Sequence, residues 1–274
     1  MEKKIILTTF TDPMMGLSYE CEPTFRKLET NFGNKIEFRY NMSLLVRDVQ
    51  DFMMPEELSM PLKEGLIRYN KRLAKIYKNE EELGGLPMSM ENLRLFDEKH
   101  RSTMPLNLAY KAVEHIAPEL ASEFLYRLRF ATIALCQPTT HIDEILPIVE
   151  QIGIDIKKFQ QAQESEKVHL ALEKDIRLCA DMGIRGLPAY LLQYGDSNLL
   201  INRFITYDTF AAAIGTLTKN RIQPRPAGIS NEALKTLLNR HPLISSVEIK
   251  EAFDLKDIAD AEKWIQPLVE RKEV

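Results

Sequence analysis

The sequence predicts an α/β protein in which a long helical segment interrupts a β-sheet. Three observations lead to this fold class. Strand-like apolar runs flank a single helical pattern within residues 1–50. Similar runs return only after residue 187, beyond a stretch of helical periodicity. The composition, with 45% hydrophobic and 28% charged residues, is typical of a globular chain with a sizeable core.

The first fifty residues follow the order strand, helix, strand. Lys4 to Phe10 is apolar and rich in β-branched residues, and the breaker pair Asp12-Pro13 follows it, which predicts a buried strand. Apolar residues recur at helical spacing from Ser18 to Phe32, so we expect one helix of about four turns there. From Ile36 to Met42 apolar residues alternate with polar ones, as in a strand with one buried face.

Residues 51–182 are helical in character and form a candidate insertion. We expect a helix over Leu62–Tyr77, broken by Gly84-Gly85, and then an irregular connection over Met88–Ser102. Helices resume after Pro105, and apolar residues mark three of them, over 120–135, 142–152 and 170–182.

A second unit with strand character follows the insertion. Pro188–Leu192 and Leu199–Phe204 are apolar runs joined by the turn residues Gly195–Asn198, which predicts a β-hairpin. Helical spacing over Tyr207–Leu217 predicts a helix after the hairpin. The order in this unit is therefore strand, strand, helix.

The remaining residues predict a linker and a small helical module. Arg221–Gly228 contains two prolines, as linkers often do, and helices are expected over 231–240, 246–255 and 258–270. The last two helices superficially suggest a helix-turn-helix. However, residues 231–274 carry seven Lys or Arg against nine Asp or Glu, whereas a DNA-binding module needs a basic face. We expect the module to pack against the main domain or a partner protein.

This order of elements is that of a thioredoxin-like fold with a helical insertion, and two segments strengthen the comparison. Thr11–Tyr19 (TDPMMGLSY) resembles the active-site segment of thioredoxin-fold proteins of the DsbA type, including the FrnE-like thiol-disulfide oxidoreductases and isomerases. Gly183–Pro188 (GIRGLP) resembles that family's cis-proline segment. The resemblance implies a thioredoxin-like domain made of residues 1–50 and 183–220, a helical insertion at 51–182, and a linker with a C-terminal helical module at 221–274.

The active-site segment lacks the residues that carry the family's chemistry. In such a site, a thiol at the start of a helix faces free backbone N–H groups and the positive end of the helix dipole, which lower its pKa. Here Met15 stands where the resemblance places the nucleophilic cysteine, and Ser18 stands in place of the resolving one. A thioether cannot ionise, and an unassisted serine hydroxyl is a weak nucleophile. Dithiol–disulfide exchange through this motif is therefore excluded.

The three cysteines elsewhere in the chain do not replace those thiols. Cys21 lies one helical turn beyond Ser18, on the same apolar stripe as Phe25, so we expect a buried core thiol. Cys136 and Cys179 fall in the helical insertion, where nothing nearby predicts an activated thiolate. We expect structural roles for all three.

The sequence therefore predicts a protein that keeps the peptide-binding edge of the family without redox turnover. It would bind an extended peptide or protein segment and would need no cofactor. A similar tail beyond the thioredoxin unit occurs in cytosolic family members that act as protease adaptors. The candidate binding residues are Met14, Met15, Gly16, Leu17, Leu187 and Pro188.

Two other interpretations remain open. Ser18 could act as a catalytic hydrogen-bond donor to glutathione, as in the kappa-class transferases and isomerases, which are a related branch of the fold. Met15, however, occupies the position at which that class keeps its catalytic serine. Alternatively, the two cysteines were replaced artificially in this sequence.

Charge and hydropathy exclude several classes of function. With a net charge of -4, the chain has no surplus of positive charge for nucleic acid or for a membrane surface. No apolar run approaches roughly 18 residues, and the stretch before Asp12 is too short for a signal-peptide core, so we expect a cytoplasmic protein. The five histidines show no metal-binding spacing, so we expect no metal site.

Overall fold

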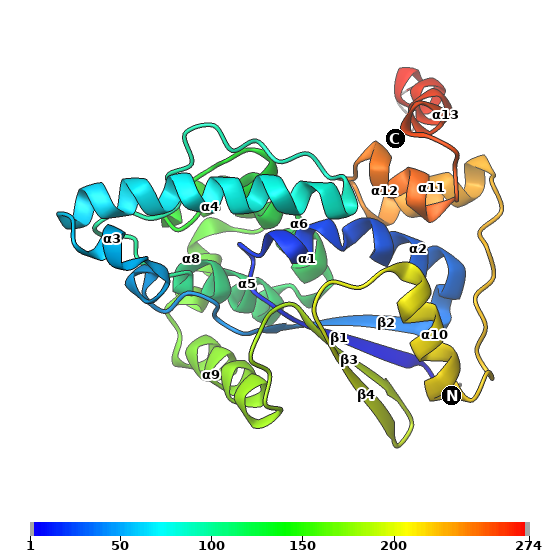
Figure 1. Ribbon diagram of the computed structural model, residues 1–274. Coiled ribbons are helices and arrows are strands. Elements are labelled where there is room, and N and C mark those ends of the chain that lie inside the picture. Colours follow the sequence, from blue (N-terminus) through cyan, green and yellow to red (C-terminus); the bar gives the residue numbers. More distant parts are fainter. Residues whose placement is uncertain (1–2, 272–274) are drawn as a thin grey trace.

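The computed structural model describes residues 3–271 and confirms the predicted fold class. Its strands are β1 (Ile5–Thr11), β2 (Ile36–Met42), β3 (Ala189–Tyr194) and β4 (Ser197–Asn202). Within the described range they form one sheet of four strands in the order β2-β1-β3-β4 (Figure 1). β2 runs parallel to β1, whereas β3 is antiparallel to both of its neighbours.

Two helices follow β1, where the sequence predicts a single one. α1 (Gly16–Glu20) and α2 (Glu22–Phe32) meet at Cys21. Pro23 lies in the first turn of α2 and has no N–H to donate back into α1, so the ladder of helical hydrogen bonds is interrupted there. α2 ends at Gly33, whose φ of 55° is a conformation that glycine adopts readily.

One face of the sheet is covered by α2 and by α10 (Tyr207–Thr218), which pack against each other. The apolar stripe that predicts the first helix lies on this buried side of α2. The side chains that meet there come from β1, β3, α2 and α10, and include Leu7, Phe25, Leu28, Tyr190 and Phe210.

The insertion between β2 and β3 is helical, as predicted. Its α-helices are α3 (Pro55–Leu58), α4 (Leu62–Gly84), α5 (Met104–Ile116), α6 (Ala121–Arg129), α7 (Ile142–Gln151), α8 (Ile156–Gln163) and α9 (Glu166–Asp181). The sequence does not predict α8, because the helix is short and polar overall, and only Phe159 and Ala162 of its eight residues are buried. α4 contacts α1 and α2 and lies on the side of them that faces away from the sheet (Figure 1).

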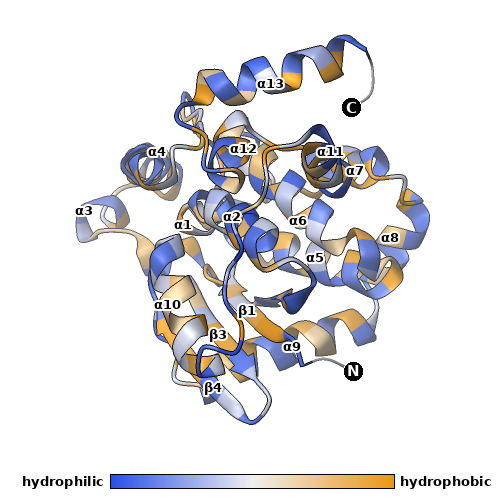
Figure 2. Ribbon diagram, turned by 90° about the vertical axis from the view of Figure 1, so that its right-hand side faces the viewer, coloured by the Kyte–Doolittle hydropathy of each residue, from blue (hydrophilic) through white to orange (hydrophobic). Residues whose placement is uncertain are grey.

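The chain beyond α10 forms a small helical module. Residues 221–230 contain no helix or strand, and α11 (Asn231–Arg240), α12 (Ser246–Ala252) and α13 (Ile258–Glu270) follow. These helices bury an apolar cluster of their own, while α12 packs on α2. Figure 2 shows α13 as the outermost element, beyond α11 and α12. Within the described residues, no helix is both long and apolar enough to cross a membrane.

Buried charges join this module to the main domain. Glu248 of α12 is fully buried, and its carboxylate accepts hydrogen bonds from Arg26 of α2 at 3.0 Å and from the hydroxyl of Tyr126 at 2.5 Å. Arg26 also forms ion pairs with Glu22 at 2.7 Å and with Glu29 at 3.4 Å. These partners offset the cost of removing the charges from water. The module therefore packs against the main domain, as the sequence predicts.

Candidate functional site

The turn after β1 is fixed by a buried carboxylate. Asp12 is fully buried, and its Oδ1 accepts the backbone N–H of Met14 at 3.0 Å. Its Oδ2 accepts hydrogen bonds from the backbone of Leu45 at 2.8 Å, from the Thr103 hydroxyl at 2.7 Å and from the Asn107 amide at 2.8 Å. Burial raises the pKa of Asp12, and these hydrogen bonds only partly offset that effect. Asp12 thus ties the candidate site to the insertion.

The residues at the start of α1 are only partly accessible. Met15 and Leu17 are partly exposed, whereas Met14, Gly16 and Ser18 are buried. Ser18, the candidate catalytic residue, has no exposed surface. It is surrounded by protein groups instead, as its hydrogen bonds show.

A polar chain inside the protein holds the Ser18 hydroxyl. Thr11 donates a hydrogen bond from its hydroxyl to the Ser18 hydroxyl at 2.8 Å. The guanidinium of Arg129, from α6, donates in turn to the Thr11 hydroxyl at 2.8 Å. A substrate therefore has no contact with Ser18 in this conformation.

Helix α4 covers the point where the family's chemistry would take place. The hydroxyl of Tyr77 donates a hydrogen bond to the carbonyl of Met14 at 2.6 Å. A Cβ atom added at Gly16 would lie 2.7 Å from a ring carbon of Tyr77 and 2.0 Å from Oε2 of Glu80. Only glycine fits beneath α4 here without displacing these side chains.

Two glutamates at this contact, the partly buried Glu80 and the buried Glu20, have carboxylates in unfavourable surroundings. Oε2 of Glu80 is buried and has no hydrogen-bond partner, and burial raises the pKa of Glu80 to about 7. Burial also raises the pKa of Glu20 to about 8, although its carboxylate accepts the backbone N–H groups of Gly84 at 2.8 Å and Leu86 at 3.3 Å. Sequence reasoning did not identify Tyr77 or Glu80, because only the packing of α4 on α1 brings them to the site.

The predicted cis-proline segment lies next to this turn. The Leu187-Pro188 peptide bond is cis. Ala189 pairs with Phe10 in the sheet, so Pro188 lies level with Thr11, immediately before the turn that leads into α1. Pro188 is buried and Leu187 is partly exposed. The structure thus brings together the two segments that carry the resemblance.

The cysteines have the structural character that the sequence predicts. Cys21 is fully buried, with its Sγ 2.9 Å from the hydroxyl of Tyr190, and burial raises the pKa of its thiol to about 12. Cys136 and Cys179 are partly buried, and burial raises the pKa of both. None of the three is activated as a thiolate.

Two surface cavities lie away from the α1 turn. A shallow cavity of about 700 Å³ lies between α4 and residues 88–91, and its walls include Lys75, Lys78, Met88 and Met90. A smaller one of about 250 Å³ lies among α2, the end of α4 and the start of α10. Neither of these two cavities is lined by Met15 or Leu187.

Comparison with known proteins gives both relatives and a family. The ClpXP adapter protein SpxH of Halalkalibacterium halodurans is 23% identical over 270 residues, which is 97% of this chain and 83% of that protein. The ClpXP adapter protein SpxH of Bacillus subtilis is 21% identical over 278 residues, covering 100% of this chain and 86% of the relative.

Solved structures share the fold at low sequence identity. The cytosolic disulfide reductase DsbM from Pseudomonas aeruginosa superimposes with a TM-score of 0.58 at 15% identity, over 78% of this chain and 98% of that one. A probable DsbA oxidoreductase from Streptomyces coelicolor gives 0.58 at 13% identity, over 82% and 94% of the two chains. A family model described as Thioredoxin matches residues 8–211. The matched residues cover most of the chain, which therefore belongs to this thioredoxin family.

Proposed function

We propose that this protein is an adapter that binds a client protein and presents it to ClpXP, and that it performs no thiol-disulfide exchange. One observation carries the proposal. The relatives that are named ClpXP adapters match 97% and 100% of this chain, and so include the C-terminal module. The family model ends at residue 211 and leaves that module out.

The chemistry at α1 supports a binding function rather than a redox one. Met15 and Ser18 cannot form a disulfide, and the nearby thiol of Cys21 has a pKa of about 12 inside the core. Helix α4 also fills the space above Gly16. A bound thiolate or disulfide would have neither a partner thiol nor room at this point.

We place the client contact on the α1–β3 surface, defined as Met15, Leu17 and Leu187 with the buried Met14, Gly16 and Pro188 beneath them. The three outer side chains are apolar and partly exposed. Flexible thioethers and leucines suit a surface that accepts varied side chains of an extended segment.

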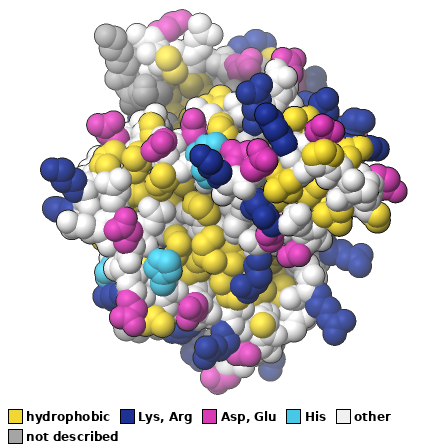
Figure 3. Space-filling view, turned by 90° about the vertical axis from the view of Figure 1, so that its left-hand side faces the viewer, with side chains coloured by type: hydrophobic (Ala, Val, Ile, Leu, Met, Phe, Trp, Pro, Cys, Tyr) yellow, Lys and Arg dark blue, Asp and Glu magenta, His cyan; other side chains and the backbone are white. Residues whose placement is uncertain are grey.

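An adapter also needs a second protein contact, and a separate apolar area is available. On the face that carries α3, hydrophobic side chains gather among charged ones (Figure 3). Phe52, Met54 and Leu58 belong to this region of the chain and are 42%, 49% and 48% exposed. Side chains of this kind at such exposure are typical of contact surfaces.

Protein lifetimes test the proposal. We expect deletion of the gene to lengthen the half-life of a small set of proteins in cells that contain ClpXP, and to have no effect on them in cells that lack it. With purified components, ClpXP should degrade such a client faster when this protein is added. If no protein changes its half-life in this way, the adapter proposal fails.

Matched variants test the surface. Leu187→Asp should slow client degradation at least tenfold, because it places a charge on the α1–β3 surface. Leu178→Asp is the control, since Leu178 is exposed to 43% on α9 and lies outside that surface. If Phe52→Asp slowed client degradation and Leu187→Asp did not, the client contact would lie on the α3 side instead.

The glutathione-dependent alternative finds no support in the geometry, because Ser18 is fully buried and its hydroxyl already accepts a hydrogen bond from Thr11. Titration calorimetry with glutathione should show no saturable heat. Saturable binding that Ser18→Ala abolishes would replace the adapter proposal with a transferase.

A further inference from the structure

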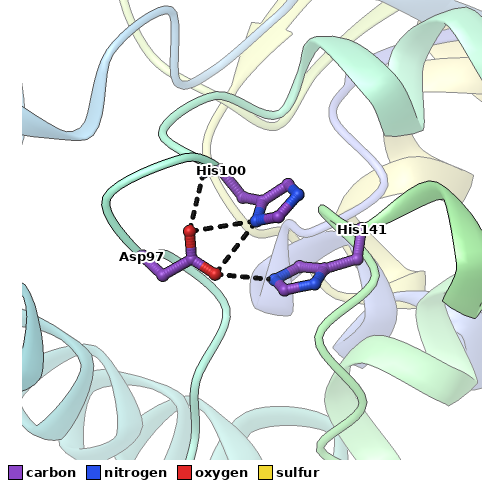
Figure 4. A group of neighbouring side chains, drawn as sticks. All are labelled: Asp97, His100 and His141. Atoms are coloured by element: carbon purple, nitrogen blue, oxygen red, sulfur yellow. Dashed lines mark hydrogen bonds and ion pairs between the residues drawn. The ribbon is translucent and has the colours of Figure 1, made fainter.

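Two loops of the insertion bring together three potential metal ligands. Asp97 and His100 lie in the irregular segment before α5, and His141 immediately precedes α7. One ligand atom from each lies within 4.8 Å of the other two (Figure 4). Spacing along the chain gives no hint of this cluster, because His100 and His141 come from separate loops.

Hydrogen bonds hold both loops in place. Oδ1 of Asp97 accepts the backbone N–H groups of Lys99 at 2.8 Å and His100 at 2.9 Å, which closes a tight turn. The hydroxyl of Thr140 donates a hydrogen bond to the carbonyl of Leu95 and so links the loop of His141 to the other one. The ligand set is therefore held together without an ion.

The distances between the ligand atoms suit a small cation. Oδ2 of Asp97 lies 2.9 Å from Nδ1 of His100 and 3.1 Å from Nε2 of His141. Two ligand atoms of a tetrahedral Zn²⁺ lie about 3.3 Å apart, given bonds of about 2.0–2.1 Å. These two separations are therefore close to those of zinc ligands, and all three atoms lie within 4.8 Å of one another.

One ligand nitrogen lacks a hydrogen-bond partner. Nε2 of His141 is buried, and Oδ2 of Asp97 approaches it to 3.1 Å, a contact that is drawn in Figure 4 but lacks the geometry of a hydrogen bond. The two imidazole rings are stacked, with centroids 3.6 Å apart and planes 23° apart.

The cluster lies close to the protein surface. The side chains of Asp97, His100 and His141 are 45%, 33% and 31% exposed. An ion would therefore reach the site from solvent after a small movement of the rings.

We infer that Asp97, His100 and His141 form a binding site for a divalent transition-metal ion such as Zn²⁺, with a fourth position open to water. Two imidazoles and one carboxylate are a donor set that zinc and its neighbours accept, and three protein ligands leave a coordination position free. The ion would give Nε2 of His141 the partner that it lacks. Its entry would rotate the stacked rings apart.

Metal titration of the purified full chain tests this inference. After treatment with a chelator, the protein should bind one Zn²⁺ with a Kd of about 10 µM or tighter, measured by competition with a chromophoric chelator. Co²⁺ bound at the site should give visible absorption bands. These bands should disappear when Zn²⁺ displaces the Co²⁺. Asp97→Asn and His141→Ala should each weaken Zn²⁺ binding at least tenfold.

Two control variants separate this site from others. His169→Ala removes an exposed histidine of α9 and should leave Zn²⁺ affinity unchanged. Cys136→Ser removes the nearest loop thiol in the sequence and should also leave the affinity unchanged. His141→Gln removes the imidazole but keeps a polar side chain, and so complements His141→Ala. Thermal unfolding of each variant checks that its fold is intact.

Three results would overturn the inference. The first is absence of Zn²⁺ binding at 100 µM free metal. The second is binding that persists at full strength in His141→Ala. The third is binding that is lost in Cys136→Ser but kept in Asp97→Asn, which would assign the ion to the thiol.

Discussion

Met15 and Ser18 stand where the resemblance to DsbA-type proteins would place two thiols, but their surroundings in the fold differ. Met15 is partly exposed at the start of α1. Ser18 is buried and accepts a hydrogen bond from Thr11, whose hydroxyl in turn accepts one from Arg129. Replacing both by cysteine would therefore restore the atoms of the family's site without restoring access to them.

We expect Met15→Cys/Ser18→Cys to show no insulin reduction above background, because Tyr77 and Glu80 still cover the turn. Adding Tyr77→Ala and Glu80→Ala should raise the rate by opening the site. If the double cysteine variant alone reduced insulin as fast as a disulfide reductase does, the native site would lack only its thiols and α4 would not block it.

At Gly16 the lack of a side chain is required by α4. Gly16→Ala should lower the free energy of unfolding by about 1–3 kcal/mol, because the new methyl group collides with Tyr77 and Glu80. Urea denaturation measures the change. Gly186→Ala is the matched control, since a Cβ there meets nothing within 4 Å, and its effect should stay within about 0.5 kcal/mol. Equal effects at the two glycines would contradict the close contact.

Among the elements, the contact of α4 with α1 makes stability depend on pH. The folded chain keeps protons on Glu80 and Glu20, whose pKa values rise to about 7 and about 8, while the unfolded chain releases them near pH 4.5. Since the folded state binds more protons within this window, their contribution to the free energy of unfolding falls as pH rises from about 4.5 to about 8.

Glu80→Gln should remove part of that fall. At pH 8 it should raise the free energy of unfolding by about 1 kcal/mol, less than the full pKa shift would give because the side chain is only partly buried. At pH 4.5 the two proteins should be equally stable. Glu82→Gln, an exposed change on the same helix, is the control. An unchanged pH profile in Glu80→Gln would refute this account.

How far the elements could be predicted depends on how local their signals are. β1 and the hairpin were predictable because apolar runs end at Asp12-Pro13 and at Gly195–Asn198. The break at Cys21 follows from Pro23, a local signal that the apolar stripe of α2 obscures. α8 escaped prediction because just two of its residues are buried, so that tertiary packing rather than periodicity defines it.

Across the whole molecule, the features that decide the site are long-range contacts. The positions of Met15, Ser18 and Pro188 followed from motif and order, and the structure brings those segments together. The cover provided by Glu80, and the meeting of His100 with His141, depend on how the insertion folds back. A pattern within one segment carries no information on such contacts.

The C-terminal module is held by charges that lie far apart in the sequence. Glu248→Ala would leave Arg26 and the Tyr126 hydroxyl without a buried partner and should cost about 3 kcal/mol. We also expect faster tryptic cleavage after Arg221, because α12 would detach from α2. Glu262→Ala, on the exposed face of α13, should leave the digestion rate unchanged. Equal cleavage in both variants would mean that apolar packing alone holds the module.

The filled space above Gly16 has an evolutionary consequence. While Tyr77 and Glu80 occupy it, a cysteine gained at position 15 would bring no catalysis for selection to act on, because α4 must also withdraw. Each of these changes alone would bring no benefit, and each would carry a cost in packing. Burial of the turn would therefore make a gain of thiol chemistry at this point slow in evolution.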